Sequence, residues 1–323
     1  MPAITTHHIF AEDVYSKLSK DLKKKLGKSY DFYLMFSQSF DFFLYSPKKR
    51  IRKMQRFAHT MNTQSYFINL VRNIKEEKLE NKTEALTYLF GSINHYVLDS
   101  IAHPFVLYKS GFYDKNNKDT FKYRGMHTRM EFMLDSYFYE AKHKKRFYKY
   151  KFINDLFPKL KPSKELKNLM NSTYRKTYNK DNMDKYFFKS YRLGRKLYRL
   201  FIYDPFGIKK FSYKIWDSVF KKGDFSKQDC SFYIKDFDFS LLNIDHKEWH
   251  HPCDERMKFN YSFLDLYDMA VKRSVYIMEE VEMILKNEKD IKELINIMPN
   301  ISYLTGLSIT KNTSLKPLQY FEF

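Results

Sequence analysis

A histidine, an aspartate and a second histidine recur at four-residue intervals inside an apolar stretch of the sequence. His95, Asp99 and His103 form an H-x3-D-x3-H motif flanked by isoleucine, valine and leucine. In an α-helix, side chains four residues apart are separated by about 6 Å along the axis and by about 40° around it, so all three project from one face. Core packing alone does not account for three such polar groups. The motif therefore predicts a long helix with a polar face inside the protein, and it favours a metal site.

Helical periodicity extends along most of the chain, and no stretch shows a convincing strand-like alternation. The expected helices cover residues 11–26, 52–76, 82–107, 120–143, 163–178, 182–202 and 262–287. The 323 residues include only 8 Gly and 9 Pro, too few breakers for a turn-rich all-β fold, and the 43% hydrophobic content excludes a disordered chain. The sequence therefore predicts an all-α, multi-helix bundle with a metal site between its helices.

We expect a single domain that spans residues 1–323. Within it, residues 1–143 would form a metal-binding helical core, because the motif and most of the histidines lie there. Residues 144–323 would form a helical extension that packs on this core. An irregular connection is expected over residues 220–260, which contain Gly223, Pro252 and scattered charges.

Nothing in the sequence marks the chain for export or for insertion into a membrane. The longest apolar runs, such as residues 40–45, fall far short of the ~20 residues that a membrane-spanning helix needs. The first thirty residues contain no apolar stretch long enough for a signal peptide. We therefore expect a cytoplasmic protein with no transmembrane segment.

The formal net charge of +20 suits an anionic partner, which includes nucleic acid, an anionic membrane surface or a phosphorylated substrate. Two stretches, residues 144–158 and 184–213, interleave basic and aromatic residues. Such stretches suit a surface that stacks on bases and binds phosphates. They equally suit amphipathic helices with an aromatic core face and a basic solvated face, which is the commoner arrangement.

Further potential metal ligands lie on the neighbouring predicted helices. His127 and Glu131 repeat the four-residue spacing, which lets two side chains close on one ion at ~2.0–2.2 Å, although an ordinary surface pair has the same spacing. His59 alone would more often be a core histidine with satisfied polar atoms. Asp41 lies among three phenylalanines, and a carboxylate buried there requires a partner.

These residues resemble the bacterial zinc-dependent phospholipase C family. The resemblance rests on the order and spacing of Met1-Pro2-Ala3 with His7 and Phe10, Asp41-Phe42-Phe43, His59, His95-Tyr96-Val97-Leu98-Asp99 with His103-Pro104-Phe105, and His127-x3-Glu131. It covers residues 1–135 closely, and residues 243–266 are similar to cytoplasmic members of the group. The resemblance implies an all-helical fold with a trinuclear zinc site, which this family shares with single-strand-specific nucleases.

The resemblance also implies which residues hold two or three zinc ions. His59, His95 and Asp99 would hold the first ion, and Asp41 would be a further ligand or the base that acts on the attacking water. Asp99 would bridge to a second ion, held by His7 and by the amine and carbonyl of a mature N-terminus at Pro2. The remaining ion would be held by His103, His127 and Glu131. In the secreted enzymes the last histidine of the helix motif lies two residues further along.

The implied activity is zinc-dependent hydrolysis of a phosphodiester, with a phospholipid as the possible substrate. Clustered zinc ions suit this reaction because they lower the pKa of a bound water and neutralise the phosphate oxygens. Two alternatives stay open: a zinc nuclease or nucleotidase that uses the same ions, and a non-enzymatic helical protein with structural zinc. The two cysteines, Cys230 and Cys253, form no disulfide framework and no recognisable nucleophilic site.

A segment far along the chain from the metal helices contains Trp249, His250 and His251. We expect this segment to fold back and to form a wall of the substrate pocket, because histidines and an indole suit that role. The alternative is a surface loop with Trp249 inserted into the helical core, which is the more frequent position of a tryptophan.

Overall fold

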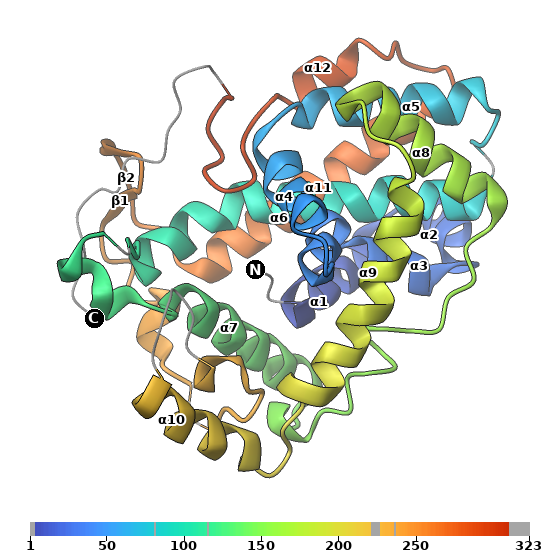
Figure 1. Cartoon of the computed structure of the whole chain (residues 1–323). Coiled ribbons are helices and arrows are strands. Elements are labelled where there is room, and N and C mark those ends of the chain that lie inside the picture. Colours follow the sequence, from blue (N-terminus) through green and yellow to red (C-terminus); the bar gives the residue numbers. More distant parts are fainter. Residues whose placement is uncertain (1–3, 81, 115, 221–226, 236, 310–323) are drawn as a thin grey trace.

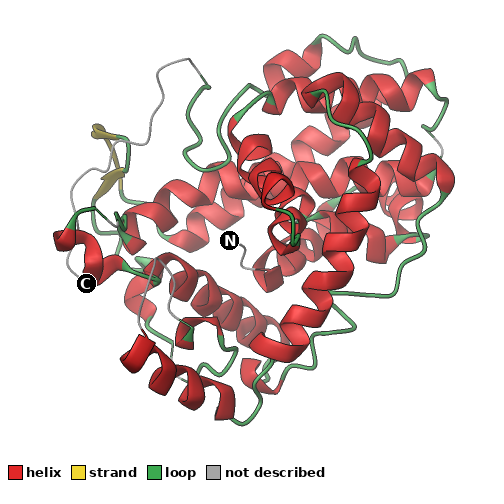
Figure 2. Ribbon diagram, viewed as in Figure 1, coloured by secondary structure: helices red, strands yellow, loops and turns green. Residues whose placement is uncertain are grey.

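One long helix, α6 (Thr83–Ser110), runs through the middle of the molecule and carries His95, Asp99 and His103 (Figure 1). The computed structural model describes residues 4–80, 82–114, 116–220, 227–235 and 237–309. Helices dominate these residues, and the sheet that they form is one short hairpin (Figure 2). The all-α prediction is therefore confirmed.

Helix α6 is surrounded by other helices along most of its length. Its neighbours include α1 (Ile4–Lys17), α3 (Tyr30–Phe36), α7 (Met126–His143) and α11 (Phe263–Leu285). A helix in such a position must be apolar on most sides, and nearly all α6 side chains from Ala85 to Val106 are buried. The polar motif of α6 consequently lies inside the protein, as the sequence predicts.

Helix α6 continues past Pro104 and ends at Ser110, three residues beyond the end expected from the sequence. Proline has no N–H group, so the carbonyl of Ser100 loses its usual helical donor. Gly306, from a loop near the end of the described chain, lies directly against this carbonyl: a Cβ at position 306 would be only 2.4 Å from Ser100 O. The helix ends where Gly111 adopts a positive φ of 65°.

Three of the helices expected from the sequence are interrupted. The one over residues 120–143 begins as a 3-10 helix that ends at Tyr123, and α7 begins only at Met126. The segment over residues 11–26 forms α1 and α2 (Lys20–Gly27), because the side chain of Ser19 accepts the N–H of Leu22 and begins a new helix. The segment over residues 52–76 forms α4 (Lys49–Thr60) and α5 (Thr63–Glu76), separated at Asn62, which has a left-handed conformation. The apolar spacing continues across the breaks at Ser19 and Asn62, which explains why periodicity alone missed them.

The later helices agree closely with the predicted ranges. α8 (Lys164–Tyr178) and α9 (Met183–Leu197) lie where expected, and a π-helical turn, η4 (Tyr198–Ile202), extends α9. Ser262 begins α11 with a capping box. The other elements are α10 (Ile208–Phe220), α12 (Glu293–Ile297), the 3-10 helices η1 (Ser39–Tyr45), η2 (Lys118–Tyr123), η3 (Phe147–Lys149), η5 (Gln228–Cys230) and η6 (Phe239–Leu242), and the strands β1 (Trp249–His251) and β2 (Asp254–Phe259). The antiparallel β1–β2 hairpin corrects the expectation of a wholly irregular connection there.

The basic and aromatic stretch of α9 is an ordinary amphipathic helix. Phe187, Phe188 and Tyr191 are buried in the core, whereas Lys189 and Arg192 face solvent. The buried rings cannot stack on nucleic-acid bases. This part of residues 184–213 therefore has the aromatic core face that the commoner interpretation predicts.

Gly91 allows α3 to approach α6 closely. A Cβ at position 91 would lie 2.6 Å from Phe36 Cβ and 2.8 Å from Tyr33 O, closer than packed atoms tolerate. The approach brings the carbonyl of Ser37, just after α3, to within 3.1 Å of the ring nitrogen Nδ1 of His95. Helix α3, which the sequence did not predict, therefore orients a residue of the motif.

The first turn of α1 is fastened to α7 by a buried carboxylate. Asp135 accepts hydrogen bonds from the backbone N–H of Thr5 (3.1 Å), the backbone N–H of Thr6 (2.7 Å) and the Thr6 hydroxyl (2.8 Å). These donors belong to the start of a helix, where backbone N–H groups have no partner within the helix. His7 is the next residue, so this contact fixes the position of its ring.

We predict that Asp135→Ala lowers the free energy of unfolding by about 1–3 kcal/mol, because three buried donors lose their acceptor. Urea unfolding followed by circular dichroism measures this change. Asp135→Asn keeps one acceptor oxygen and should lose less stability. Equal stability of Asp135→Ala and the unmodified chain would contradict the proposed fastening of α1.

Candidate metal centre

The carboxylate of Asp99 lies between four imidazole rings. Its Oδ1 is 3.1 Å from His7 Nε2 and 3.5 Å from His103 Nδ1. Its Oδ2 is 3.4 Å from His95 Nε2 and 3.5 Å from His59 Nε2. Asp99 is buried, and Oδ2 has no hydrogen-bond partner among the described residues. A buried carboxylate oxygen in this state is costly unless a cation is present.

One potential ligand group surrounds this carboxylate at the meeting point of α1, η1, α4 and α6. Ligand atoms of His7, Asp41, His95 and Asp99 all lie within 4.8 Å of one another, and all four residues are buried. His59, from α4, adjoins them: its Nε2 is 3.0 Å from His95 Nε2 and 3.3 Å from Asp41 Oδ1. Two ligand atoms on one tetrahedral zinc ion are about 3.4 Å apart, so these spacings fit a shared ion.

A second potential ligand group lies between α6 and α7. Glu131 Oε1 is 3.1 Å from His127 Nε2 and 3.6 Å from His103 Nε2. The two imidazole rings are stacked, with their centroids 5.8 Å apart. This group is the more accessible one, since the His127 side chain is 28% exposed. His103 also contacts Asp99, so the two ligand groups are continuous.

Backbone carbonyls fix the orientation of the inner imidazole rings. His59 Nδ1 is 2.7 Å from the carbonyl of Gln55, and His95 Nδ1 is 3.1 Å from that of Ser37. A carbonyl only accepts, so each Nδ1 carries a proton, and each Nε2 is the nitrogen that faces the carboxylates. Metal-binding histidines in proteins characteristically have such a contact on the nitrogen that faces away from the ion.

The loop over residues 299–309 completes this set of contacts. Tyr303 places its carbonyl 3.2 Å from His103 Nδ1 and donates its own N–H to the carbonyl of His59 at 2.9 Å. Its buried ring packs against His59 and His95. Gly306 holds the loop against α6, as described above. This loop, about 200 residues along the chain from the motif, therefore orients His103 of the motif and the neighbouring His59.

The ionisable groups of the centre depart strongly from their ordinary behaviour. Burial would raise the pKa of Asp41, but the charges of His95 and His59 outweigh it and hold this pKa well below its usual range. Burial lowers the pKa of His59, but the hydrogen bond to Asp41 and its charge raise it to about 9. Burial lowers the pKa of His95 to about 4, because the charges of the nearby carboxylates offset only part of the effect of burial. The ionised Asp41 and the neutral His95 are in the forms that bind a metal ion, whereas His59 would release a proton on binding one.

The donor set fits zinc. It contains imidazole nitrogens and carboxylate oxygens, which are zinc ligands in proteins, and the buried Asp99 Oδ2 has no hydrogen-bond partner among the described residues. A cavity of about 30 Å³ is lined by members of both ligand groups, among them His7, Asp99, His103 and Glu131. This space suits an ion or a water molecule.

The structure brings together eight of the sequence-predicted ligands: His7, Asp41, His59, His95, Asp99, His103, His127 and Glu131. Pro2 lies outside the described residues. Trp249 and His251 contact other parts of the protein. The Trp249 ring packs on Phe105, and its Nε1 donates to the carbonyl of Tyr261 at 3.0 Å.

His251 joins the β1–β2 hairpin to the loop over residues 299–309. Its Nδ1 accepts the N–H of Cys253 at 3.0 Å, so its Nε2 carries the proton and donates to the carbonyl of Thr305 at 2.8 Å. His250 packs its ring against Tyr108 of α6. The histidines of this segment thus contact elements that border the metal centre, and a role in substrate binding stays a prediction.

Sequence reasoning missed two residues of the centre. Gln55 Nε2 donates to Asp41 Oδ1 at 2.7 Å, and Tyr303 makes the contacts given above. Gln55 precedes His59 by four residues, so helical spacing could have placed it on the same face. No comparable signal connects Tyr303 with the motif, because a loop far along the chain has no periodicity.

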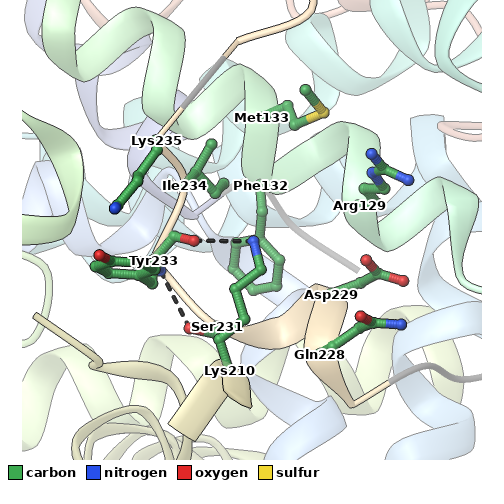
Figure 3. Close-up of a pocket in the computed structure, with 10 residues that line it drawn as sticks. All are labelled: Arg129, Phe132, Met133, Lys210, Gln228, Asp229, Ser231, Tyr233, Ile234 and Lys235. Carbon is green, nitrogen blue, oxygen red and sulfur yellow. Dashed lines mark hydrogen bonds between the residues drawn. The ribbon is translucent and has the colours of Figure 1, made fainter. Parts of the chain in front are cut away.

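A larger cavity, of about 400 Å³, lies away from the candidate ligands (Figure 3). Arg129 and Met133 of α7, Lys210 of α10 and Tyr233 are among its lining residues. None of the eight candidate ligands lines it. The face of α7 that borders this cavity is different from the face that presents His127 and Glu131.

Comparison with known proteins gives one result that bears on this centre. A family model described as zinc dependent phospholipase C matches residues 6–196, more than half of the chain. The matched region contains all eight candidate ligands. No curated protein and no solved structure gave a significant match. The chain therefore belongs to the zinc-dependent phospholipase C family.

Proposed function

We propose that this protein is a zinc-dependent phosphodiesterase that hydrolyses a phospholipid in the manner of a phospholipase C. The family description names both zinc and this activity. The buried set of nitrogen and oxygen ligands between α1, α4, α6 and α7 supports the proposal. No helix among the described residues is both long and apolar enough to cross a membrane.

The position of Asp99 is the observation that carries this proposal. Its Oδ1 faces His7 and His103, whereas its Oδ2 faces His95 and His59. A carboxylate whose two oxygens face different imidazoles is placed to bridge two ions. Paired metal ions are a common arrangement for phosphoester hydrolysis, because they stabilise both the attacking and the leaving oxygen.

We infer three ligand sets for two or three zinc ions. They are His59, His95 and Asp99; Asp99, His7 and the mature N-terminus at Pro2; and His103, His127 and Glu131. Zinc bound by these residues would lower the pKa of a water molecule and neutralise the charge of the phosphate. The phosphate would approach from the side of His127, which is the most exposed of the candidate ligands.

Asp41 is our candidate for the group that accepts the proton of the attacking water. Gln55 Nε2 donates to its Oδ1 at 2.7 Å and fixes the carboxylate plane. Its Oδ2 lies 4.0 Å from His95 Nε2. A carboxylate fixed in this way can hold the proton until it passes to the leaving group.

We predict that the protein binds two or three equivalents of zinc and that Asp99→Ala loses more than one of them, because the bridging carboxylate serves two ions. Plasma emission spectrometry of the purified proteins measures the zinc content. Asp184→Ala is a matched control: Asp184 is a buried aspartate of α9 that accepts a hydrogen bond from Asn171 and belongs to neither ligand group. The control should keep the full zinc content. A zinc-free natural protein, or an Asp99→Ala variant with unchanged content, would reject the bridging role.

We predict that Asp41→Asn keeps most of its zinc but loses on the order of 10²–10⁴ in the rate of phosphodiester hydrolysis, which is the usual cost of removing a general base. The assay uses a soluble chromogenic phosphodiester, with zinc content measured in parallel. Asp31→Asn, an exposed aspartate of α3, is the control and should retain its activity. Undiminished hydrolysis by Asp41→Asn would contradict the assignment.

A further inference from the structure

Helix α10 turns its apolar face away from the protein. Ile208, Phe211, Ile215 and Val219 follow one another at intervals of three and four residues, so they share one side of the helix. Their exposed fractions are 68%, 67%, 52% and 65%. Trp216 is 48% exposed, and Phe206, just before the helix, is 80% exposed. We call these six residues the α10 apolar face.

The inward side of α10 is polar. Asp217 is the buried residue of this helix, and it accepts the backbone N–H groups of Lys227 at 3.2 Å and Gln228 at 3.0 Å. Asp204 holds the other end, since it accepts the N–H groups of Lys209 at 3.2 Å and Lys210 at 2.8 Å. A helix on the surface of a soluble protein normally has the opposite orientation, with its apolar side inward. These buried carboxylates fix the orientation that leaves the apolar side exposed.

The sequence around the α10 apolar face is rich in positive charge. The described residues 192–220 contain seven Lys and Arg residues and only two acidic residues, Asp204 and Asp217. Both acidic side chains are buried and engaged in the contacts just described. Lys214 is exposed, and Lys227 Nζ lies 3.7 Å above the Trp216 ring. An amphipathic helix with aromatic and aliphatic residues on one face and a basic surround is characteristic of proteins that lie on anionic bilayers.

We propose that the α10 apolar face inserts into the surface of an anionic lipid bilayer. A second copy of the chain is disfavoured as the occupant, because each copy has a net charge of +20 and would bring the same basic region to the contact. Nucleic acid is disfavoured because only Phe206, Phe211 and Trp216 could stack on bases. The aliphatic half of the face, Ile208, Ile215 and Val219, would stay exposed to water. A bilayer supplies both an apolar interior for these side chains and negative charge for the lysines.

This docking surface is separate from the metal centre. The cavity of Figure 3, lined by Arg129 and Met133 of α7 and by Lys210 of α10, lies between α10 and α7. His127 and Glu131 lie on another face of α7 and contact α6. The proposal therefore goes beyond the hydrolytic function, and either can fail without the other.

The test compares two pairs of exposed isoleucines in the full-length protein. One double variant, Ile208→Ser with Ile215→Ser, changes the α10 apolar face. The control double variant, Ile244→Ser with Ile295→Ser, changes isoleucines elsewhere whose exposed fractions are 50% and 52%. Binding is measured by flotation with vesicles of phosphatidylcholine, with and without phosphatidylglycerol, in zinc and in EDTA. We expect binding to the anionic vesicles in both media, weaker binding at high salt, and at least a tenfold loss in the α10 pair but not in the control pair.

Tryptophan fluorescence provides a second measurement. The chain has two tryptophans, and Trp249 is only 3% exposed, so a shift of the emission to shorter wavelength on anionic vesicles reports on Trp216. Trp216→Phe should abolish the shift and preserve flotation. The proposal would be overturned if the two double variants floated equally or if the protein did not bind anionic vesicles. It would also be overturned by a dimer in gel filtration that only the α10 double variant disrupts. Hydrolysis of the soluble phosphodiester should be equal in both pairs, which keeps the test independent of the metal centre.

Discussion

A single buried carboxylate organises the centre of this protein. Asp99 lies on the most enclosed helix of the fold, where an uncompensated negative charge is costly. Imidazoles from α1, α4 and two further positions of α6 surround it at 3.1–3.5 Å. These helices therefore meet at one point: α1 packs on α6, and α4, which packs on η1, reaches Asp99 through His59. Occupation of the site by zinc would complete the compensation.

The surroundings of the ligands depend on segments that are far apart in the sequence. Carbonyl groups of Ser37 and Gln55 contact the outer nitrogens of two imidazoles, and the carbonyl of Tyr303 contacts His103 Nδ1. Asp135 fixes the helix that carries His7. The carbonyl contacts hold the imidazole rings in place, and the Asp135 contacts hold α1 in place. Groups that lie outside the ligand motifs thus preorganise the centre.

Two neighbouring amphipathic helices are oriented in opposite ways. α9 buries Phe187, Phe188 and Tyr191 and exposes its basic residues, whereas α10 buries Asp217 and exposes its apolar side. α9 lies almost wholly within the basic and aromatic stretch over residues 184–213, and α10 begins in it. The difference arises because Asp204 and Asp217 bind backbone N–H groups and hold the polar side of α10 inward. A hydrolase with this arrangement would contact lipid through one surface and bind its metal ions in another.

The sequence by itself determined the helical class and the ligand candidates at four-residue spacing on α6 and α7, because both depend on local spacing, whereas His7 became a candidate only through the family resemblance. The four-residue intervals of His95, Asp99 and His103 require only a helix, and apolar periodicity located α8 and α11 within a few residues. The breaks at Ser19 and Asn62 escaped detection because apolar spacing continues across them. Only the tertiary structure joined the motif to Gln55 and Tyr303 and decided which side of α10 faces outward. Such contacts join residues through space, where sequence periodicity carries no information, and an amphipathic pattern defines two faces without showing which one the protein buries.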